Sequence, residues 1–229
     1  MSATAHVVFV PGMARPATDA DPFFRHLPTG WRTTAVARSV SDEPFSVGDA
    51  LADILSPARH GDNPVVLVGH SFGGYLAELA YYQLLSSQPE RKVALVLLDA
   101  SVADVPRPWL NPGTLWRWWR PLMTVAPHPV EHFLHENSAF RATAKVVRAA
   151  RDTWREPLLT GGPDGSRVVV TARWINNRLT RALPWSWFTK QARLARGLGA
   201  RHLVVSPSGH HVMLQHPKEV AEIVAATLR

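Results

Sequence analysis

The sequence predicts an α/β fold in which helices cover both faces of a mostly parallel β-sheet. The first observation is that apolar runs such as 65–68 and Val93–Leu98 are nearly continuous, as in strands buried on both faces. The second is that these runs alternate with helix-favouring segments. The third is the length of 229 residues with 46% hydrophobic content, which suits one domain with a sizeable core.

The first part of the chain, residues 1–104, supplies most of this core. Ser46 is a candidate N-cap, with Asp49 in the capping-box position three residues later. Helices are expected over 19–27, 46–55 and 72–85. Strands are expected over His6–Val10, 31–37, 65–68 and Val93–Leu98.

Residues 105–162 interrupt the alternation, because they carry seven prolines and five tryptophans. We interpret them as a cap inserted over the carboxyl edge of the sheet, with helices over 114–123 and 129–154. The core then resumes over 163–229. There we expect strands at Arg167–Ala172 and 202–206, a helix over 184–196, and a C-terminal helix that begins at His216-Pro217.

The chain is basic, with a formal net charge of +7, and the charge is uneven. Residues 165–218 contain nine Lys and Arg side chains and no Asp or Glu. This excess of positive charge indicates either a solvated face or a docking surface for an acidic partner. Such a partner could be a carrier protein that bears an acyl chain, or an anionic membrane surface. No nucleic-acid recognition motif accompanies the charge, so nucleic acid is not an expected partner.

Composition and motifs also exclude several classes of protein. There is no cysteine, no apolar run long enough for a membrane span, and no apparent signal peptide, so we expect a cytoplasmic protein. Nucleotide-binding glycine motifs are missing, which argues against a nucleotide cofactor. Three histidines at helical spacing, His128, His132 and His135, are expected to form a polar rim of the cap rather than a metal site.

The segment Gly69-His70-Ser71-Phe72-Gly73-Gly74 follows an apolar strand and precedes a helix. This is the G-x-S-x-G pattern of a nucleophile elbow, in which a serine on a very tight turn is lifted above the sheet edge. The flanking glycines provide room for the turn because they lack a Cβ atom. Ser71 is therefore the predicted nucleophile.

This segment, together with Val-Phe-Val-Pro-Gly at 8–12, Val-Leu-Leu-Asp-Ala at 96–100 and Ser-Gly-His-His-Val-Met-Leu at 208–214, resembles the α/β-hydrolase fold superfamily, in particular its esterase- and lipase-like serine hydrolases. Members usually begin with a β-hairpin that this chain lacks. The resemblance therefore implies a smaller sheet, of about six strands. It also implies the chain order serine, acid, histidine.

The resemblance places the catalytic base after the last strand, where His210 follows Gly209. His211 is the alternative base, and otherwise a pocket residue. Most members carry the acid after the strand that corresponds to Arg167–Ala172, but no carboxylate follows it here. A subset places the acid one strand earlier, which assigns Asp99. Asp104 in the same loop, or Asn176 or Asn177 as a degenerate third member, stays open.

The resemblance implies an oxyanion hole made of two backbone N–H groups, those of Met13 and Phe72. Its loop usually reads His-Gly, and here it reads Pro11-Gly12. Trp109, Trp116 and His211 are expected to line an apolar substrate pocket.

We therefore expect a cofactor-independent serine hydrolase that cleaves a carboxylic ester or thioester through an acyl-enzyme. The alternatives are a lyase, acyltransferase or perhydrolase of the same fold, or a non-catalytic receptor for a small ligand.

Overall fold

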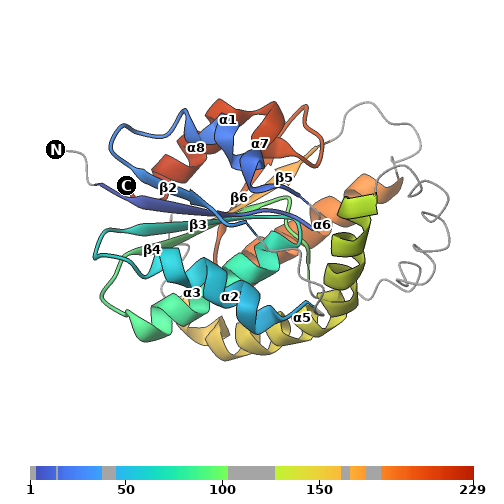
Figure 1. Ribbon diagram of the computed structural model, residues 1–229, viewed down its shortest axis with the longest axis horizontal. Helices are drawn as coiled ribbons and strands as arrows, with labels where there is room; N and C mark the ends of the chain where they lie inside the picture. Colours follow the sequence, from blue (N-terminus) through green and yellow to red (C-terminus); the bar gives the residue numbers. More distant parts are fainter. Residues whose placement is uncertain (1–3, 14, 38–44, 103–126, 161–165, 174–181) are drawn as a thin grey trace.

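A computed structural model describes residues 4–13, 15–37, 45–102, 127–160, 166–173 and 182–229, with the backbone alone at 127–141, 160 and 182–186. Its centre is one sheet of six parallel strands in the order β2-β1-β3-β4-β5-β6 (Figure 1). The strands are β1 (His6–Val10), β2 (Arg32–Ala35), β3 (Val65–His70), β4 (Val93–Leu98), β5 (Arg167–Ala172) and β6 (Arg201–Val205). The predicted fold class and the expected number of strands are confirmed.

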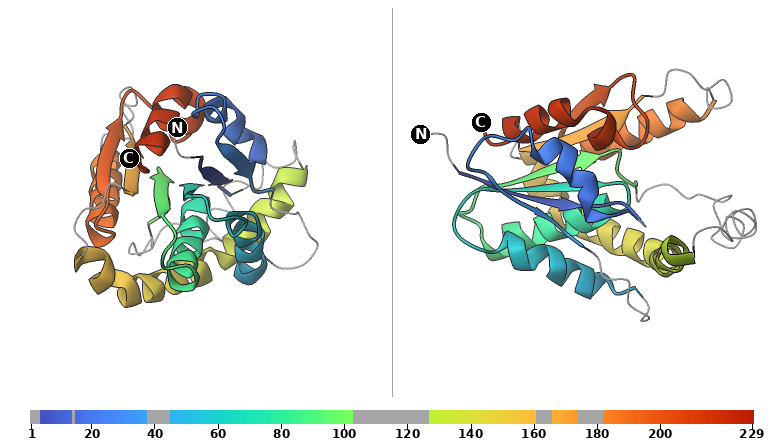
Figure 2. Two further views of the ribbon diagram at one scale, coloured as in Figure 1. Left: turned by 90° about the vertical axis from the view of Figure 1, so that its left-hand side faces the viewer. Right: turned by 45° about the horizontal axis from the view of Figure 1, so that its top comes forward.

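Helices cover both faces of this sheet, as expected (Figures 1 and 2). One face packs against α2 (Val47–Ala58), α3 (Gly73–Ser87), α5 (Pro127–Thr160) and α6 (Ala182–Gly197). The other packs against the 3-10 turn η1 (Ala17–Ala20) and the helices α1 (Asp21–Phe24), α7 (Val212–Gln215) and α8 (Pro217–Ala226). Alternate residues of β3 belong to the two hydrophobic cores, one on each face of the sheet. Val65 and Leu67 face α2 and α3, and Val66 and Val68 face α1 and α8.

The parallel register brings the carboxyl ends of the strands to one edge of the sheet. Val10 pairs with Gly69, and His70 pairs with Leu98. Residues that directly follow these strands, such as Ser71 after β3 and Asp99 after β4, are therefore placed beside one another.

The start of α2 shows how local sequence sets an element. The Ser46 side chain accepts a hydrogen bond from the Asp49 N–H at 3.2 Å, as the capping-box position predicts. The helix continues to Ala58, three residues beyond the expected end, although Pro57 lies in its last turn, and the Arg59 N–H donates to the Leu55 carbonyl at 2.9 Å.

The predicted cap range ends in a helix that joins the core. Arg151 of α5 forms a two-pronged ion pair with Glu78 of α3, with nitrogen–oxygen distances of 2.9 and 2.8 Å. Tyr82 donates to the same Glu78 carboxylate at 2.7 Å, and its ring stacks on Trp154. The second half of α5 thus forms part of the helical layer over the sheet. Residues 103–126 lie outside the described part of the chain.

None of the helices that the structure describes is both long and apolar enough to cross a membrane.

Candidate active site

Ser71 occupies a sharp turn between β3 and α3. Its φ angle is 51°, in the left-handed region that a serine rarely adopts. Two backbone hydrogen bonds hold the turn, since the Ser71 N–H donates to the Leu98 carbonyl at 3.2 Å and the Ser101 N–H donates to the Ser71 carbonyl at 2.9 Å. The side chain is partly exposed at the carboxyl edge of the sheet. The strained backbone is the geometry that a nucleophile elbow requires.

Small neighbours make this turn possible. A Cβ atom on Gly69 would lie 2.7 Å from the Ala77 Cβ and from the Gly74 Cα, which is closer than real Cβ contacts allow. A Cβ on Gly74 would lie 2.5 Å from the Ala100 Cβ. The glycines therefore let α3 pack tightly against β3 and the loop after β4.

Asp99 and His210 meet at this edge. The His210 Nδ1 and the Asp99 Oδ2 lie 2.6 Å apart, and the Asp99 side chain is 4% exposed. Asp99 also has a positive φ of 43°, and its N–H donates to the Val170 carbonyl at 2.7 Å. An imidazole bonded to a buried carboxylate through Nδ1 presents Nε2 for proton transfer.

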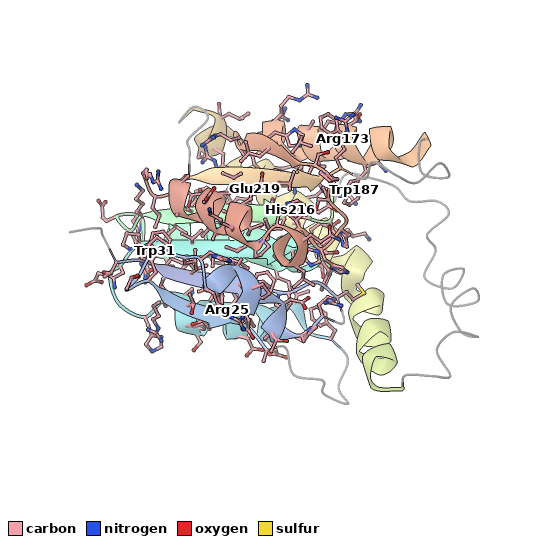
Figure 3. The ribbon with its side chains drawn as sticks, turned by 90° about the horizontal axis from the view of Figure 1, so that it is seen from above. Arg25, Trp31, Arg173, Trp187, His216 and Glu219 are labelled. Atoms are coloured by element: carbon pink, nitrogen blue, oxygen red, sulfur yellow. The ribbon has the colours of Figure 1, made fainter. Side chains whose placement is uncertain are left out.

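The second oxygen of the Asp99 carboxylate is held as well. The indole Nε1–H of Trp187 on α6 donates to Oδ1 at 2.8 Å, and the Ala172 N–H donates to it at 3.2 Å. Figure 3 labels Trp187 and Arg173, the residue that follows β5. Both oxygens of the Asp99 carboxylate are thus engaged by nitrogen partners.

His70, the residue before Ser71, lies buried beneath the histidine loop. Its Nε2–H donates to the His210 carbonyl at 3.0 Å, and its ring centroid is 4.7 Å from that of His210. Burial, and then the proximity of His210, hold the pKa of His70 well below its ordinary value, so this ring is neutral. The neutral His70 ring thus holds the His210 loop through its hydrogen bond and does not compete with His210 for a proton.

The loop after β1 passes directly beside the nucleophile. A Cβ on Gly12 would lie 3.2 Å from the Ser71 Cβ and 2.9 Å from the His70 Nδ1, so a larger residue there would displace the His70 ring. Met13 follows, partly exposed and packed against the core. The structure thus brings together the loop carrying Met13 and the turn carrying Phe72.

Phe72 follows Ser71 at the start of α3, whose N-terminus is the positive end of the helix dipole. The Phe72 ring is fully buried and packs edge-on against Phe45 and Tyr75. Its side chain therefore belongs to the core, and only its backbone faces the turn.

His211 lies beside the other two histidines, with its ring centroid 5.5 Å from that of His210 and 5.3 Å from that of His70. Burial, and then the nearby Arg15, lower the pKa of His211. The hydrogen bond to Asp99 comes from His210.

Several predicted residues lie outside the described part of the chain. They are Trp109, Trp116, Asp104, Asn176 and Asn177, and the side chains of His128, His132 and His135. Within the described residues, no group of three or more His, Asp or Glu side chains is placed to hold a metal ion.

Two residues that contact the predicted catalytic side chains or their loops were not expected from the sequence. They are His70, which bonds to the His210 carbonyl, and Trp187, which bonds to Asp99. His70 is part of the elbow motif, and its position next to Ser71 is the signal that points to it. Trp187 has no such signal, because it meets Asp99 across 88 residues of chain.

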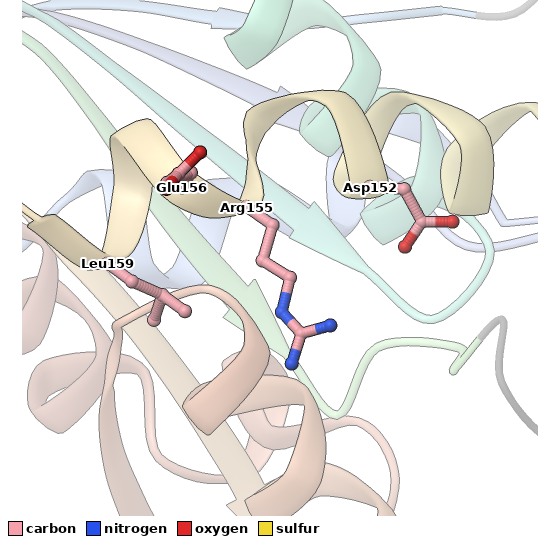
Figure 4. A pocket seen from close by; sticks show the side chains of 4 residues that line it. All are labelled: Asp152, Arg155, Glu156 and Leu159. Carbon is pink, nitrogen blue, oxygen red and sulfur yellow. The ribbon is translucent and has the colours of Figure 1, made fainter.

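A separate surface cavity of about 500 Å³ lies along α5 (Figure 4). It is lined by Asp152, Arg155, Glu156 and Leu159, and by none of Ser71, Asp99 and His210. This cavity is therefore distinct from the histidine and serine cluster.

Part of the chain is similar in sequence to a known lipase. The chain is 50% identical over 54 residues to Lipase LipV of Mycobacterium tuberculosis, a match that covers 24% of this chain and 18% of LipV. The match thus covers less than a fifth of LipV. The lipase activity is therefore a property of LipV and is not transferred to this chain.

Two solved structures share the fold across nearly the whole chain. A carboxylesterase structure of the archaeon Nitrososphaera gargenis matches with a TM-score of 0.63 and 15% identity, over 99% of this chain and 90% of that one. The AqdC variant that recognises and cleaves the ring of the Pseudomonas quinolone signal matches with a TM-score of 0.60 and 18% identity, over 100% and 92%. A model of the "Alpha/beta hydrolase family" matches residues 7–223. The chain belongs to the alpha/beta hydrolase family.

Proposed function

We propose that this protein is a serine hydrolase that cleaves a carboxylic ester or thioester through an acyl-enzyme. The observation that carries the proposal is the 2.6 Å contact between His210 Nδ1 and Asp99 Oδ2 at the sheet edge where Ser71 sits on a positive-φ turn. A serine hydroxyl is a poor nucleophile at neutral pH and needs a base, which in turn needs an orienting carboxylate. Family membership supports the same chemistry.

In the proposed reaction, Ser71 Oγ attacks the substrate carbonyl while His210 Nε2 accepts its proton. The Asp99 carboxylate holds His210 in the tautomer with a proton on Nδ1 and stabilises the imidazolium that forms. His210 then gives the proton to the leaving alcohol or thiol. A water molecule, deprotonated by His210, releases the acid and regenerates Ser71.

The developing oxyanion is proposed to bind the backbone N–H groups of Met13 and Phe72. The close approach of Gly12 to the Ser71 Cβ supports this, because it brings the loop after β1 to the turn that carries Phe72. Fixed backbone dipoles stabilise the tetrahedral intermediate without reorganising, and each donor is worth about 3 kcal/mol.

Asp99, rather than Asp104, is proposed as the acid. Its support is direct, since one carboxylate oxygen contacts His210 and the other accepts two N–H groups. Burial to 4% exposure also strengthens its electrostatic effect on His210.

The substrate is proposed to carry an apolar acyl or alcohol group. The support comes from the tryptophan-rich segment 108–121 of the predicted cap, from which Trp109 and Trp116 are proposed, with His211, to line the pocket. A chain-length series of chromogenic acyl esters tests this. Rates should rise from acetate toward medium chains, and a preference for acetate alone would contradict the apolar pocket.

The basic region 165–218 is proposed to dock an acidic carrier that bears the acyl chain. Arg193 and Arg196 are exposed on the same side of α6, which supports a surface role. Charge reversal at both positions should reduce activity on carrier-bound substrate and leave free-ester activity unchanged. Equal effects on both substrates would contradict a docking role.

Loss of ester hydrolysis in Ser71→Ala, with an unchanged thermal unfolding midpoint, tests the proposed function as a whole. Retained hydrolysis would contradict it. If the wild type hydrolyses no ester or thioester, assays with alcohol, peroxide and carbon–carbon substrates distinguish the related acyltransfer, perhydrolysis and lyase reactions.

A further inference from the structure

Helix α6 contacts the loop that carries Asp99 at two positions one helical turn apart. The Trp187 indole donates to the Asp99 Oδ1 at 2.8 Å, and the Gln191 amide Nε2 donates to the Ala100 carbonyl at 2.5 Å. Residues four apart lie on the same face of a helix, so both side chains project from one face toward the end of β4. Gln191 is fully buried. Helix α6 therefore forms hydrogen bonds both to the Asp99 carboxylate and to the backbone carbonyl of Ala100.

The indole bond settles which oxygen of Asp99 faces His210. A carboxylate on a short side chain turns readily about its last torsion, since that torsion has broad minima. Here Oδ1 is engaged by Trp187 and by the Ala172 N–H, which leaves Oδ2 directed at the His210 Nδ1. The Ala172 bond is the longer of the two at 3.2 Å, so Trp187 is the closer donor.

Burial makes this donor hard to replace. The Asp99 side chain is 4% exposed, so without the indole its Oδ1 would keep only the longer Ala172 bond, and losing a donor to a buried charge is costly. The indole is also suited to the position, because it donates a hydrogen bond and does not titrate. It supports the carboxylate at every working pH.

We propose that Trp187 is a positioning residue for the catalytic acid: its indole N–H fixes the Asp99 carboxylate so that Oδ2 orients His210. This inference rests on the proposed serine hydrolase function, because its consequence for turnover requires the Ser71–His210–Asp99 chemistry. The proposed role of the indole runs through Asp99, to which it donates its hydrogen bond.

A second consequence is electrostatic. The positive end of the indole dipole points at the carboxylate and partly offsets its negative charge. Without the indole, the negative charge of Asp99 that faces His210 is less offset. The acid limb of the pH–rate profile should then move to higher pH. A residue that merely fills space would not move that limb.

Trp187→Phe tests the proposal, since it removes the N–H and keeps an aromatic ring. We expect kcat to fall about tenfold with KM nearly unchanged, because a hydrogen bond to a buried charged group is worth at least that factor. The acid limb should also move upward. The matched control is Trp154→Phe, in which the replaced ring stacks on Tyr82 at a centroid distance of 5.9 Å. We expect the control to keep the wild-type kcat and profile.

Unchanged kcat and an unchanged acid limb in Trp187→Phe would overturn the proposal. So would equal losses in both variants that follow their thermal unfolding midpoints, because packing alone would then explain them.

A spectroscopic measurement tests the contact without any substrate. The nine tryptophans give indole N–H resonances in a ¹⁵N–¹H spectrum, and the Trp187 resonance is the one that Trp187→Phe removes. It should shift in Asp99→Asn, where the charged acceptor is lost, while the Trp154 resonance stays in place. If the chemical shift of the Trp187 resonance is unchanged in Asp99→Asn, the proposal is overturned. If wild-type protein hydrolyses no ester yet this shift occurs, the proposed function fails and the Trp187 contact stands.

Discussion

His210 and Asp99 are 111 residues apart in the chain, and their side chains meet at 2.6 Å. Asp99 directly follows β4, and His210 lies in the loop after β6, so the contact spans the carboxyl end of β5, which lies between them. The positive φ of 43° at Asp99 belongs to this arrangement, since a left-handed residue turns the chain sharply at the end of the strand.

Asp99→Asn should lower kcat by about 10³- to 10⁴-fold, because an amide no longer enforces the correct tautomer of His210 or stabilises its cation. Steady-state kinetics on a chromogenic ester measure this effect. The matched control is Asp104→Asn, for which we expect a loss below about threefold. A larger loss for Asp104→Asn than for Asp99→Asn would move the acid to Asp104.

The tight packing of the elbow is open to a stability measurement. Gly69→Ala places a Cβ 2.7 Å from the Ala77 Cβ and from the Gly74 Cα, and should lower the free energy of unfolding by about 2 kcal/mol or more. Gly48→Ala is the matched control. Its nearest neighbour would be the Ser46 Oγ at 3.6 Å, and alanine favours the helix by up to about 1 kcal/mol. Denaturant unfolding compares the two, and equal stabilities would contradict the steric argument.

The buried ion pair between Glu78 and Arg151 should contribute to the docking of α5. Arg151→Met leaves the Glu78 carboxylate buried beside Tyr82 and should cost about 3 kcal/mol of unfolding free energy. In the double variant Glu78→Gln, Arg151→Met, no unpaired charge stays behind, so part of the loss should return. A double variant less stable than Arg151→Met would show that the stranded charge is not the main cost.

His6 gives a prediction on pH. Burial is the main cause that lowers its pKa from 6.5 to about 4, so the folded protein keeps this ring neutral while the unfolded chain takes up a proton. The stability that neutral His6 contributes is therefore complete above pH 6.5 and is lost as the pH falls toward 4. His70 acts in the same direction, because its pKa is also lowered.

Thermal unfolding between pH 7 and 4.5 tests this sign. His6→Leu removes one of the histidines whose pKa is lowered, so its unfolding midpoint should fall less steeply with decreasing pH than that of the wild type. A parallel or steeper fall would contradict a neutral, buried His6.

The sheet and the elbow were predictable because their signals are local. Residues 65–68 of β3 are all apolar, and the glycines around Ser71 indicate a turn that needs small residues. The contact between Trp187 and Asp99 has no local signal. It depends on how α6 packs at the end of β4, and neither residue's neighbours in the sequence reveal it.

The contact between helix α5 and the core also lacks a local signal in the sequence. Proline and tryptophan content predicted a cap for 105–162, yet Arg151 reaches the core through its ion pair with Glu78. That pairing joins residues 73 positions apart, and a charged residue in a mostly polar helix gives no sign that its partner is buried.

The most direct test of the serine hydrolase proposal is intact-protein mass spectrometry after treatment with a serine-directed fluorophosphonate. An activated Ser71 should acquire one phosphonate group, located to Ser71 by peptide mapping. The adduct should be absent in Ser71→Ala and form far more slowly in Asp99→Asn. No adduct on folded wild-type protein, or an adduct that persists in Ser71→Ala, would contradict Ser71 as the nucleophile.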